Sequence, residues 1–150
     1  MANLTIDGTK VRLIEDYEAP GGSGGASIPS AVAAIAGGQM IAYDASGKAI
    51  LADATTAANY KGLMIVRKGV TYINQTVHGF RDCLMNLGPG VLDGLAYGAP
   101  LFLSDTPGMI ADAAGTDEVQ IGVVDALWDG ATPTKIARIR IPISGITPAA

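Results

Sequence analysis

The residue types that most often carry catalysis are scarce in this chain and stand apart from one another. His78 is the sole histidine, and no Gly-x-Ser-x-Gly segment surrounds a serine. A Ser-His-Asp system would therefore have to draw its members from unrelated parts of the chain. We interpret His78 as a polar residue on a strand face, one of the many roles that histidine fills. Cys83 stands in an apolar run with Leu84 and Met85, where a thiol usually serves as packing.

The patterns that resemble ligand sites lack the spacing that such sites need. Gly88-Pro89-Gly90 with Gly94 matches neither Gly-x-Gly-x-x-Gly nor the P-loop, so we interpret it as a turn. None of the aspartates stands in a loop with ligands at alternating positions and a terminal glutamate, as a calcium loop requires. An aspartate that begins a turn, such as Asp44, bonds the backbone two residues on. The sequence therefore predicts no metal and no cofactor.

Paired carboxylates are the remaining route to acid-base chemistry. Glu15-Asp16, Glu18 and Asp117-Glu118 could converge in the folded chain, as an acid and its base must. Their spacing does not single them out from the other acidic residues. We therefore predict no catalytic residue, no small-molecule substrate and a non-enzymatic protein.

Composition bounds the class of protein and the kinds of partner. The chain has 150 residues, of which 49% are hydrophobic and 16% charged, as in one folded domain that hides much of its surface. A net charge of −4 provides no basic surface for a phosphate backbone, so we predict no nucleic-acid partner. No stretch reaches the roughly 18 apolar residues of a membrane span, and the N-terminus lacks a secretion signal. The single cysteine suits a reducing cytoplasm.

The first 37 residues are predicted to form an N-terminal strand and an extended Gly-rich arm. Residues 4–15 alternate between apolar and polar, which indicates a short hairpin or edge strand. A Gly-rich stretch follows at 20–25, where the composition predicts flexibility. In the Ala-rich segment 27–38, Ile28, Val32 and Ile35 have the spacing of one helical stripe. We expect at most this one short helix.

Ordering the arm calls for more contacts than the arm itself offers. Fixing the backbone of about 15 residues costs on the order of 15–30 kcal/mol. Burying Ile28, Val32 and Ile35 returns ~5–9 kcal/mol. We therefore predict that these three residues bind a partner. The alternative is that the arm folds back as a short helix on its own domain.

Residues 38–150 are predicted to form a small β-barrel or β-sandwich of repeated hairpins. Short apolar strands alternate with turns, and Gly38–Ala54 resembles Gly98–Ala113, each followed by a strand that contains glycine, Gly62–Ile65 and Gly122–Val124. In the last strand, 135–143, Ala137, Ile139, Ile141 and Ile143 share one face. Arg138 and Arg140 occupy the other face and are available to acidic groups of a partner. Trp128 lies beside a turn and is either a core filler or an interface anchor.

The second half of the chain resembles a known family. The segment Gly98-Ala99-Pro100-Leu101-Phe102-Leu103-Ser104-Asp105-Thr106-Pro107-Gly108-Met109-Ile110, followed by Ile121-Gly122-Val123-Val124, is similar to the small capsid cement (decoration) proteins of tailed bacteriophages. The resemblance extends over residues 38–143 and does not include the arm. It implies a β-rich protein, often a homotrimer, on the outer capsid surface of the virion, assembled in the host cytoplasm. The implied partner is the major capsid protein, whose lattice the cement protein stabilises.

A second hypothesis comes from the class of binding modules. A β domain of a phage tail or fibre could bind a receptor or a glycan, and exposed aromatic side chains would mark its site. Most aromatic residues of the chain lie in strand-like runs, so we favour the cement hypothesis.

Overall fold

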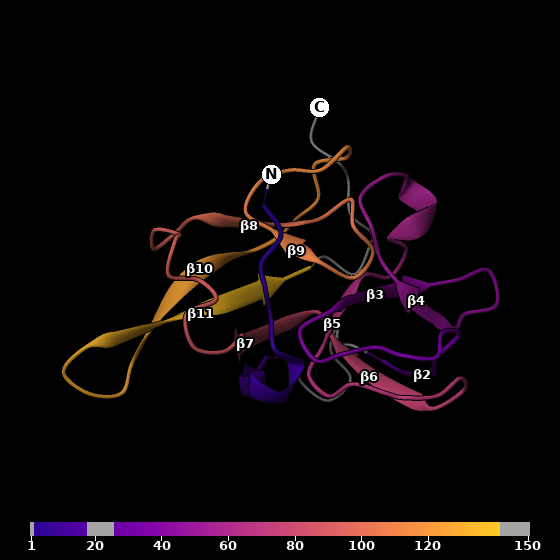
Figure 1. Cartoon of the computed structure of the whole chain (residues 1–150), viewed down its shortest axis with the longest axis horizontal. Helices are drawn as coiled ribbons and strands as arrows, with labels where there is room; N and C mark the ends of the chain where they lie inside the picture. Colours follow the sequence, from indigo (N-terminus) through magenta and orange to yellow (C-terminus); the bar gives the residue numbers. More distant parts are fainter. Residues whose placement is uncertain (1, 18–25, 142–150) are drawn as a thin grey trace.

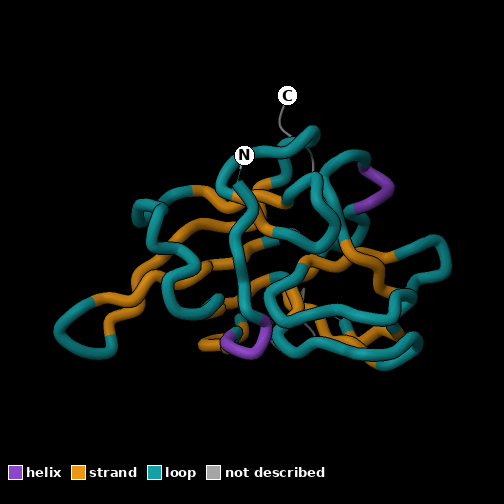
Figure 2. The backbone as a smooth tube through the Cα atoms, in the orientation of Figure 1, coloured by secondary structure: helices purple, strands orange, loops and turns teal. Residues whose placement is uncertain are grey.

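The computed structural model describes residues 2–17 and 26–141 and is mainly β, which confirms the expected fold class (Figures 1 and 2). Within these ranges the helical elements are two short 3-10 helices, η1 (Gly8–Lys10) and η2 (Ala57–Asn59). The strands are β1 (Arg12–Asp16), β2 (Ser27–Pro29), β3 (Met40–Tyr43), β4 (Ala49–Leu51), β5 (Met64–Val66), β6 (Thr76–Phe80), β7 (Asp82–Asn86), β8 (Pro100–Leu103), β9 (Ile110–Ala111), β10 (Gln120–Trp128) and β11 (Pro133–Arg140).

The strands form two antiparallel sheets, which occupy the left and right halves of Figure 1. The six-stranded sheet has the order β1-β7-β11-β10-β8-β9, and the five-stranded sheet has the order β2-β6-β5-β3-β4. Four neighbouring strands of each sheet have the same arrangement relative to the order of the chain. They are β6-β5-β3-β4 in the first half of the chain and β11-β10-β8-β9 in the second.

The strands β3 and β8, which begin these two sets, are preceded by the same turn. Gly38 and Gly98 have φ angles of 82° and 84°, a region that glycine enters without a Cβ clash. The Gly38 amide donates to the Val66 carbonyl at 2.7 Å, and the Gly98 amide donates to the Val124 carbonyl at 2.8 Å. The same glycine turn therefore precedes the first strand of each set of four.

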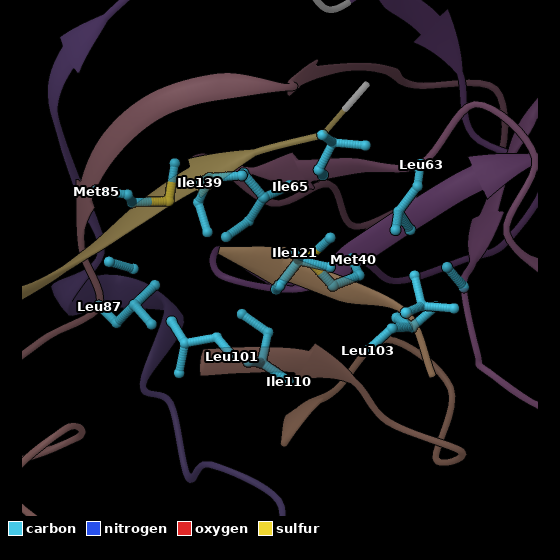
Figure 3. Packing of buried hydrophobic residues seen from close by; sticks show 14 of the residues in the cluster. Met40, Leu63, Ile65, Met85, Leu87, Leu101, Leu103, Ile110, Ile121 and Ile139 are labelled. Carbon is cyan, nitrogen blue, oxygen red and sulfur yellow. The ribbon is translucent and has the colours of Figure 1, made fainter. Parts of the chain in front are cut away.

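The main hydrophobic core lies between the two sheets (Figure 3). Each aliphatic side chain that is fully buried there contributes ~1.5–3 kcal/mol to stability relative to an exposed one. The five-stranded side supplies Met40, Leu63 and Ile65, and the six-stranded side supplies Met85, Leu101, Leu103, Ile110, Ile121 and Ile139, among others. Both sheets therefore belong to one packed unit.

A second hydrophobic cluster occupies the opposite face of the five-stranded sheet. Ile41, Met64 and Val66 point into it, whereas Met40 and Ile65 point into the main core. The central strands β3 and β5 are therefore buried on both faces, which explains their unbroken apolar sequences.

The five-stranded sheet curls around this second cluster. An isolated bridge joins Ser30, just after β2, to Ala49 in β4, so the two edge strands approach each other. No pairing of described strands closes either sheet into a barrel. The barrel, one of the two expected architectures, is therefore not formed, and two packed sheets remain.

The helix expected within residues 27–38 is wrong. Ser27–Pro29 is the strand β2, and bends and a turn follow it up to Gly38. Pro29 explains the difference, because proline has no amide hydrogen and biases the preceding residue, Ile28, toward extended backbone. The Gly-rich stretch at 20–25 and the end of the last expected strand, Ile143, lie outside the described residues.

Candidate functional site

His78 and Ser27 lie opposite each other on the paired strands β6 and β2. The Ser27 hydroxyl is 2.8 Å from His78 Nδ1, and the imidazole and the Phe80 ring form a T-shaped pair with centroids 4.6 Å apart. Among residues 2–17 and 26–141, no carboxylate bonds this imidazole to complete a triad. The contact is that of an ordinary cross-strand pair on one sheet face.

The candidate carboxylates bond to tyrosines in different parts of the fold. Asp117 accepts a hydrogen bond of 2.9 Å from the Tyr60 hydroxyl, and Glu15 accepts one of 3.2 Å from Tyr17. Burial of Tyr60, with the Asp117 carboxylate beside it, raises the pKa of Tyr60 to about 12. Glu18 lies outside the described residues. The Tyr60–Asp117 bond links distant parts of the chain, the Tyr17–Glu15 bond is local to the end of β1, and the two carboxylates do not form an acid-base pair.

The described ranges contain neither a cluster of metal ligands nor a helix that could span a membrane. In that part of the chain no three His, Cys, Asp or Glu side chains gather closely enough to hold a metal ion. Neither of its helices has the length and apolar character needed to cross a bilayer. The Cys83 side chain is fully buried.

The three apolar residues of the expected arm pack on the chain's own five-stranded sheet. Ile35 is 3% exposed, and Ile28 and Val32 are half-buried against the same second cluster. The amides of Ile35 and Val70 also donate to each other's carbonyl, at 3.1 and 2.8 Å. The segment thus folds back on its own domain, but as a strand and bends. Ile35 is committed to this core, whereas Ile28 and Val32 keep part of their surface exposed.

Arg138 and Arg140 point away from the main core. They alternate with Ala137 and Ile139, which are fully buried, as the sequence pattern predicts. The Arg138 guanidinium lies over the Tyr17 ring, 5.3 Å from its centroid.

Leu84 and Val123 flank Arg138 on the neighbouring strands, and both are half-buried. We call this surface, with Tyr17, Leu84, Val123, Arg138 and Arg140, the open face of the six-stranded sheet. It carries two arginines among apolar side chains, with Asp82 opposite Arg140 and Glu15 opposite Leu84 on the neighbouring strands.

Trp128 lies on the hairpin of β10 and β11, at the left end of Figure 1. Its side chain is 65% exposed, so it is not a core filler. We call residues 125–135 the tip. Lys135 connects the base of the tip to the preceding loop. Its ammonium donates to the Leu95 carbonyl at 2.5 Å and lies over the Tyr97 ring. Beside it is a groove of about 360 Å³ lined by Asp93, Tyr97 and Pro133, among others.

Arg67 and Lys68 border a cleft that the sequence reasoning missed. The cleft has a volume of about 700 Å³ and is lined by Gly8, Thr9 and Val11 and by residues 35–37 and 67–71. Both basic side chains are exposed, and a second groove of about 290 Å³ shares them. The available signal was that Arg67-Lys68 is the sole adjacent pair of basic residues in the sequence. We call this site the basic cleft.

Comparisons with family models and with curated proteins do not relate the chain to a known family. No family model matches the chain, and a search of the curated proteins finds no match.

Proposed function

We propose that this chain is a capsid cement protein of a tailed bacteriophage. It binds the outer surface of an assembled head, stabilises the lattice of the major capsid protein and acts as a homo-oligomer, with a trimer favoured. It is non-enzymatic and uses no cofactor, and its partners include neither nucleic acid nor membrane. Its location is the outer capsid surface of the virion, reached after assembly in the host cytoplasm.

The observation that carries this proposal is the open face. Ile65 and Phe80 pair across β5 and β6 and lie in the core between the sheets. The corresponding pair across β10 and β11 is Val123 and Arg138, and these residues are only half-buried. A sheet face with partly exposed apolar and cationic side chains suits contact with a protein surface that carries acidic groups.

The effect on the capsid follows from mass action. A protein that binds the assembled lattice and not its separated subunits stabilises the lattice by its free energy of binding. Many copies on one head, each held as an oligomer, add avidity to a modest individual affinity. This mechanism needs a rigid body and an exposed contact surface, and it needs no catalytic group.

We also infer that the fold is a sandwich built from two copies of one hairpin unit, β3–β6 and β8–β11. The shared strand order supports this, and so do matching hydrogen bonds. The Tyr43 amide donates to the Lys61 carbonyl, and the Leu103 amide donates to the Val119 carbonyl, both at 2.9 Å.

Sedimentation with undecorated heads of the phage that encodes the chain tests the proposal. We expect saturable binding and a higher temperature of head disruption. Arg140→Glu should weaken binding by about tenfold, because it places a like charge against acidic groups of the partner. Lys61→Glu, which reverses an exposed charge away from the open face, is the matched control. Heads that neither retain the protein nor gain stability would contradict the proposal.

One observation favours the alternative of a tail- or fibre-associated β domain that binds a receptor or a glycan. Trp128 and Tyr97 are exposed beside the groove of about 360 Å³, and aromatic side chains next to polar groups suit a sugar ring. Saturation-transfer NMR with a panel of glycans would detect such binding. The alternative requires a signal that is lost in Trp128→Ala and kept in Arg140→Glu.

A further inference from the structure

The hairpin of β10 and β11 extends beyond the strands that flank it. β8 pairs with β10 at residues 120–123, and β7 pairs with β11 at residues 137–140. From Asp125 to Ile136 the two long strands pair with each other. Figure 1 shows this ribbon projecting from the left end of the molecule. A two-stranded ribbon has little stability of its own. Contacts between the end of the ribbon and a partner would therefore stabilise it.

The end of the ribbon combines an apolar anchor with acidic groups. Trp128, with the largest exposed fraction of the described large hydrophobic residues, lies directly opposite Pro133. The exposed acidic residue is Asp129, whereas Asp125 accepts a hydrogen bond from the Ala126 amide at 2.8 Å and the ammonium of Lys135 is turned back onto the Leu95 carbonyl. The surface that suits this tip is therefore an apolar recess with a cationic rim.

The basic cleft has those properties. Its lining includes Gly8, Gly37 and Gly69, and the side chains of Val11, Ile35 and Val70 reach its floor with only 8%, 3% and 4% of their surface exposed. Arg67 and Lys68 supply the positive charge, and neither the cleft nor the adjoining groove is lined by a carboxylate among the described residues.

The acidic residue that precedes the first cleft-lining segment already accepts hydrogen bonds from its own turn. Asp7 accepts hydrogen bonds from the amide and the hydroxyl of Thr9, at 3.0 and 2.7 Å. Beyond the cleft, Tyr72 and Ile73 are 62% and 55% exposed. They extend the apolar surface along the same connection between β5 and β6.

The tip and the cleft cannot meet within one molecule. The ribbon projects at the left end of Figure 1, whereas β5, β6 and their connection lie in the right half, beyond η1. The two surfaces are complementary in charge, and they are present in equal numbers in any solution of this chain. A second copy is therefore the partner that the molecule itself supplies.

We propose that the tip of one copy docks in the basic cleft of a second copy. Trp128 enters the recess between residues 8–11 and 67–71, where an arginine can lie over its ring. Asp129 lies against Arg67 and Lys68. Trp and Arg are the residue types most often found at the energetic centres of interfaces.

This contact is heterologous, because it joins two different surfaces. Repetition of such a contact produces a closed ring if the rotation closes, and a filament if it does not. A ring of three copies agrees with the trimer of the proposed function. The inference rests on that function and adds the interface through which the copies bind each other. It leaves the open face of each copy free for the capsid.

Disulfide trapping between two single-site variants tests this contact. Ala131→Cys places a thiol on the exposed turn of the tip, and Thr71→Cys places one at the exposed edge of the cleft. The native Cys83 is fully buried and stays in place. Under mild oxidation the mixture of the two variants should form disulfide-linked dimers, and each variant alone should not. Links formed by Ala131→Cys alone, or none in the mixture, would overturn the contact.

Charge reversal provides a second readout that does not depend on disulfide geometry. Asp129→Lys and Lys68→Glu should each weaken self-association by about tenfold in analytical ultracentrifugation. The double variant should regain most of the affinity, and Lys61→Glu should match the wild type. A wild type that stays monomeric, or a double variant as weak as either single one, would overturn the proposal. No heads are present, so failure here leaves capsid binding to be decided by the sedimentation experiment.

Discussion

The two halves of the molecule share an order of strands and differ in what covers their faces. In the first half, β3 and β5 are buried on both sides, by the main core and by the second cluster. In the second half, one face packs on the main core, and on the open face Val123 and Arg138 are only half-buried. One scheme of connections thus yields an enclosed half and an open half.

The halves also differ in the length of corresponding strands. β5 has 3 residues and β10 has 9, whereas β6 has 5 and β11 has 8. The longer pair projects as the tip, and the shorter pair is joined by a connection, residues 67–75, that borders the basic cleft. The two halves therefore share a strand order. They differ in strand length and side-chain exposure, which give the second half the tip and the first half the basic cleft.

The largest effect should come from truncating corresponding residues in the enclosed and open halves. Ile65→Ala removes a fully buried side chain and should lower the free energy of unfolding by ~2–5 kcal/mol. Val123→Ala, at the corresponding position on the open face, should cost less than ~1 kcal/mol. Urea denaturation measures both. Equal losses would show that a covering layer protects the open face in the free protein.

Glycine substitutions should separate the body of the second half from its tip. A Cβ at Gly122 would collide with the Arg138 carbonyl on the neighbouring strand, whereas Gly130 at the tip has open space around it. We expect Gly122→Ala to lower the melting temperature with a loss of ~1–3 kcal/mol. Gly130→Ala should change stability by less than ~0.5 kcal/mol. A mild Gly122→Ala would mean that β10 and β11 are less closely paired than described.

The hydrogen bond from Tyr60 to Asp117 joins the two halves, and its removal should have a smaller effect. Tyr60→Phe should lower the free energy of unfolding by about 1 kcal/mol. In the folded protein the pKa of Tyr60 is raised from 10.0 to about 12.

Between these values the unfolded chain releases the proton and the folded chain keeps it, so stability falls as pH rises. The difference between wild type and Tyr60→Phe, measured by urea denaturation, should therefore shrink above pH 10. A constant difference would contradict the raised pKa.

The smallest effect on folding is expected at the tip itself. Trp128→Ala removes a side chain that is 65% exposed and should change the melting temperature little, with less than ~0.5 kcal/mol lost. The same variant should weaken self-association, because Trp128 is the anchor of the proposed contact. Calorimetry and ultracentrifugation on one preparation distinguish these effects. A large loss of stability would place Trp128 in the fold of its own molecule.

The sequence predicted the features that depend on neighbouring residues. The alternation of Ala137 and Ile139 with Arg138 and Arg140 indicated the buried and outward faces of β11 correctly. The spacing of Ile28, Val32 and Ile35 predicted a helix that is not formed, because Pro29 biases Ile28 toward the extended backbone of β2.

The features that depend on distant contacts could not be predicted. The internal resemblance matched Gly62 with Gly122, but strand pairing places Met64 opposite Ile41 just as Gly122 lies opposite Leu101. Gly62 is instead a turn residue with a φ of 64°. The basic cleft combines three segments that lie far apart along the chain, so no local pattern contains it.

Electron cryomicroscopy of undecorated heads incubated with the protein tests the central claim most directly. We predict added density on the outer surface of the head, at repeated lattice positions, with the open face and Arg140 against the major capsid protein. The tips should point toward neighbouring copies. Heads without added density, or copies that contact the lattice through another face, would contradict the account.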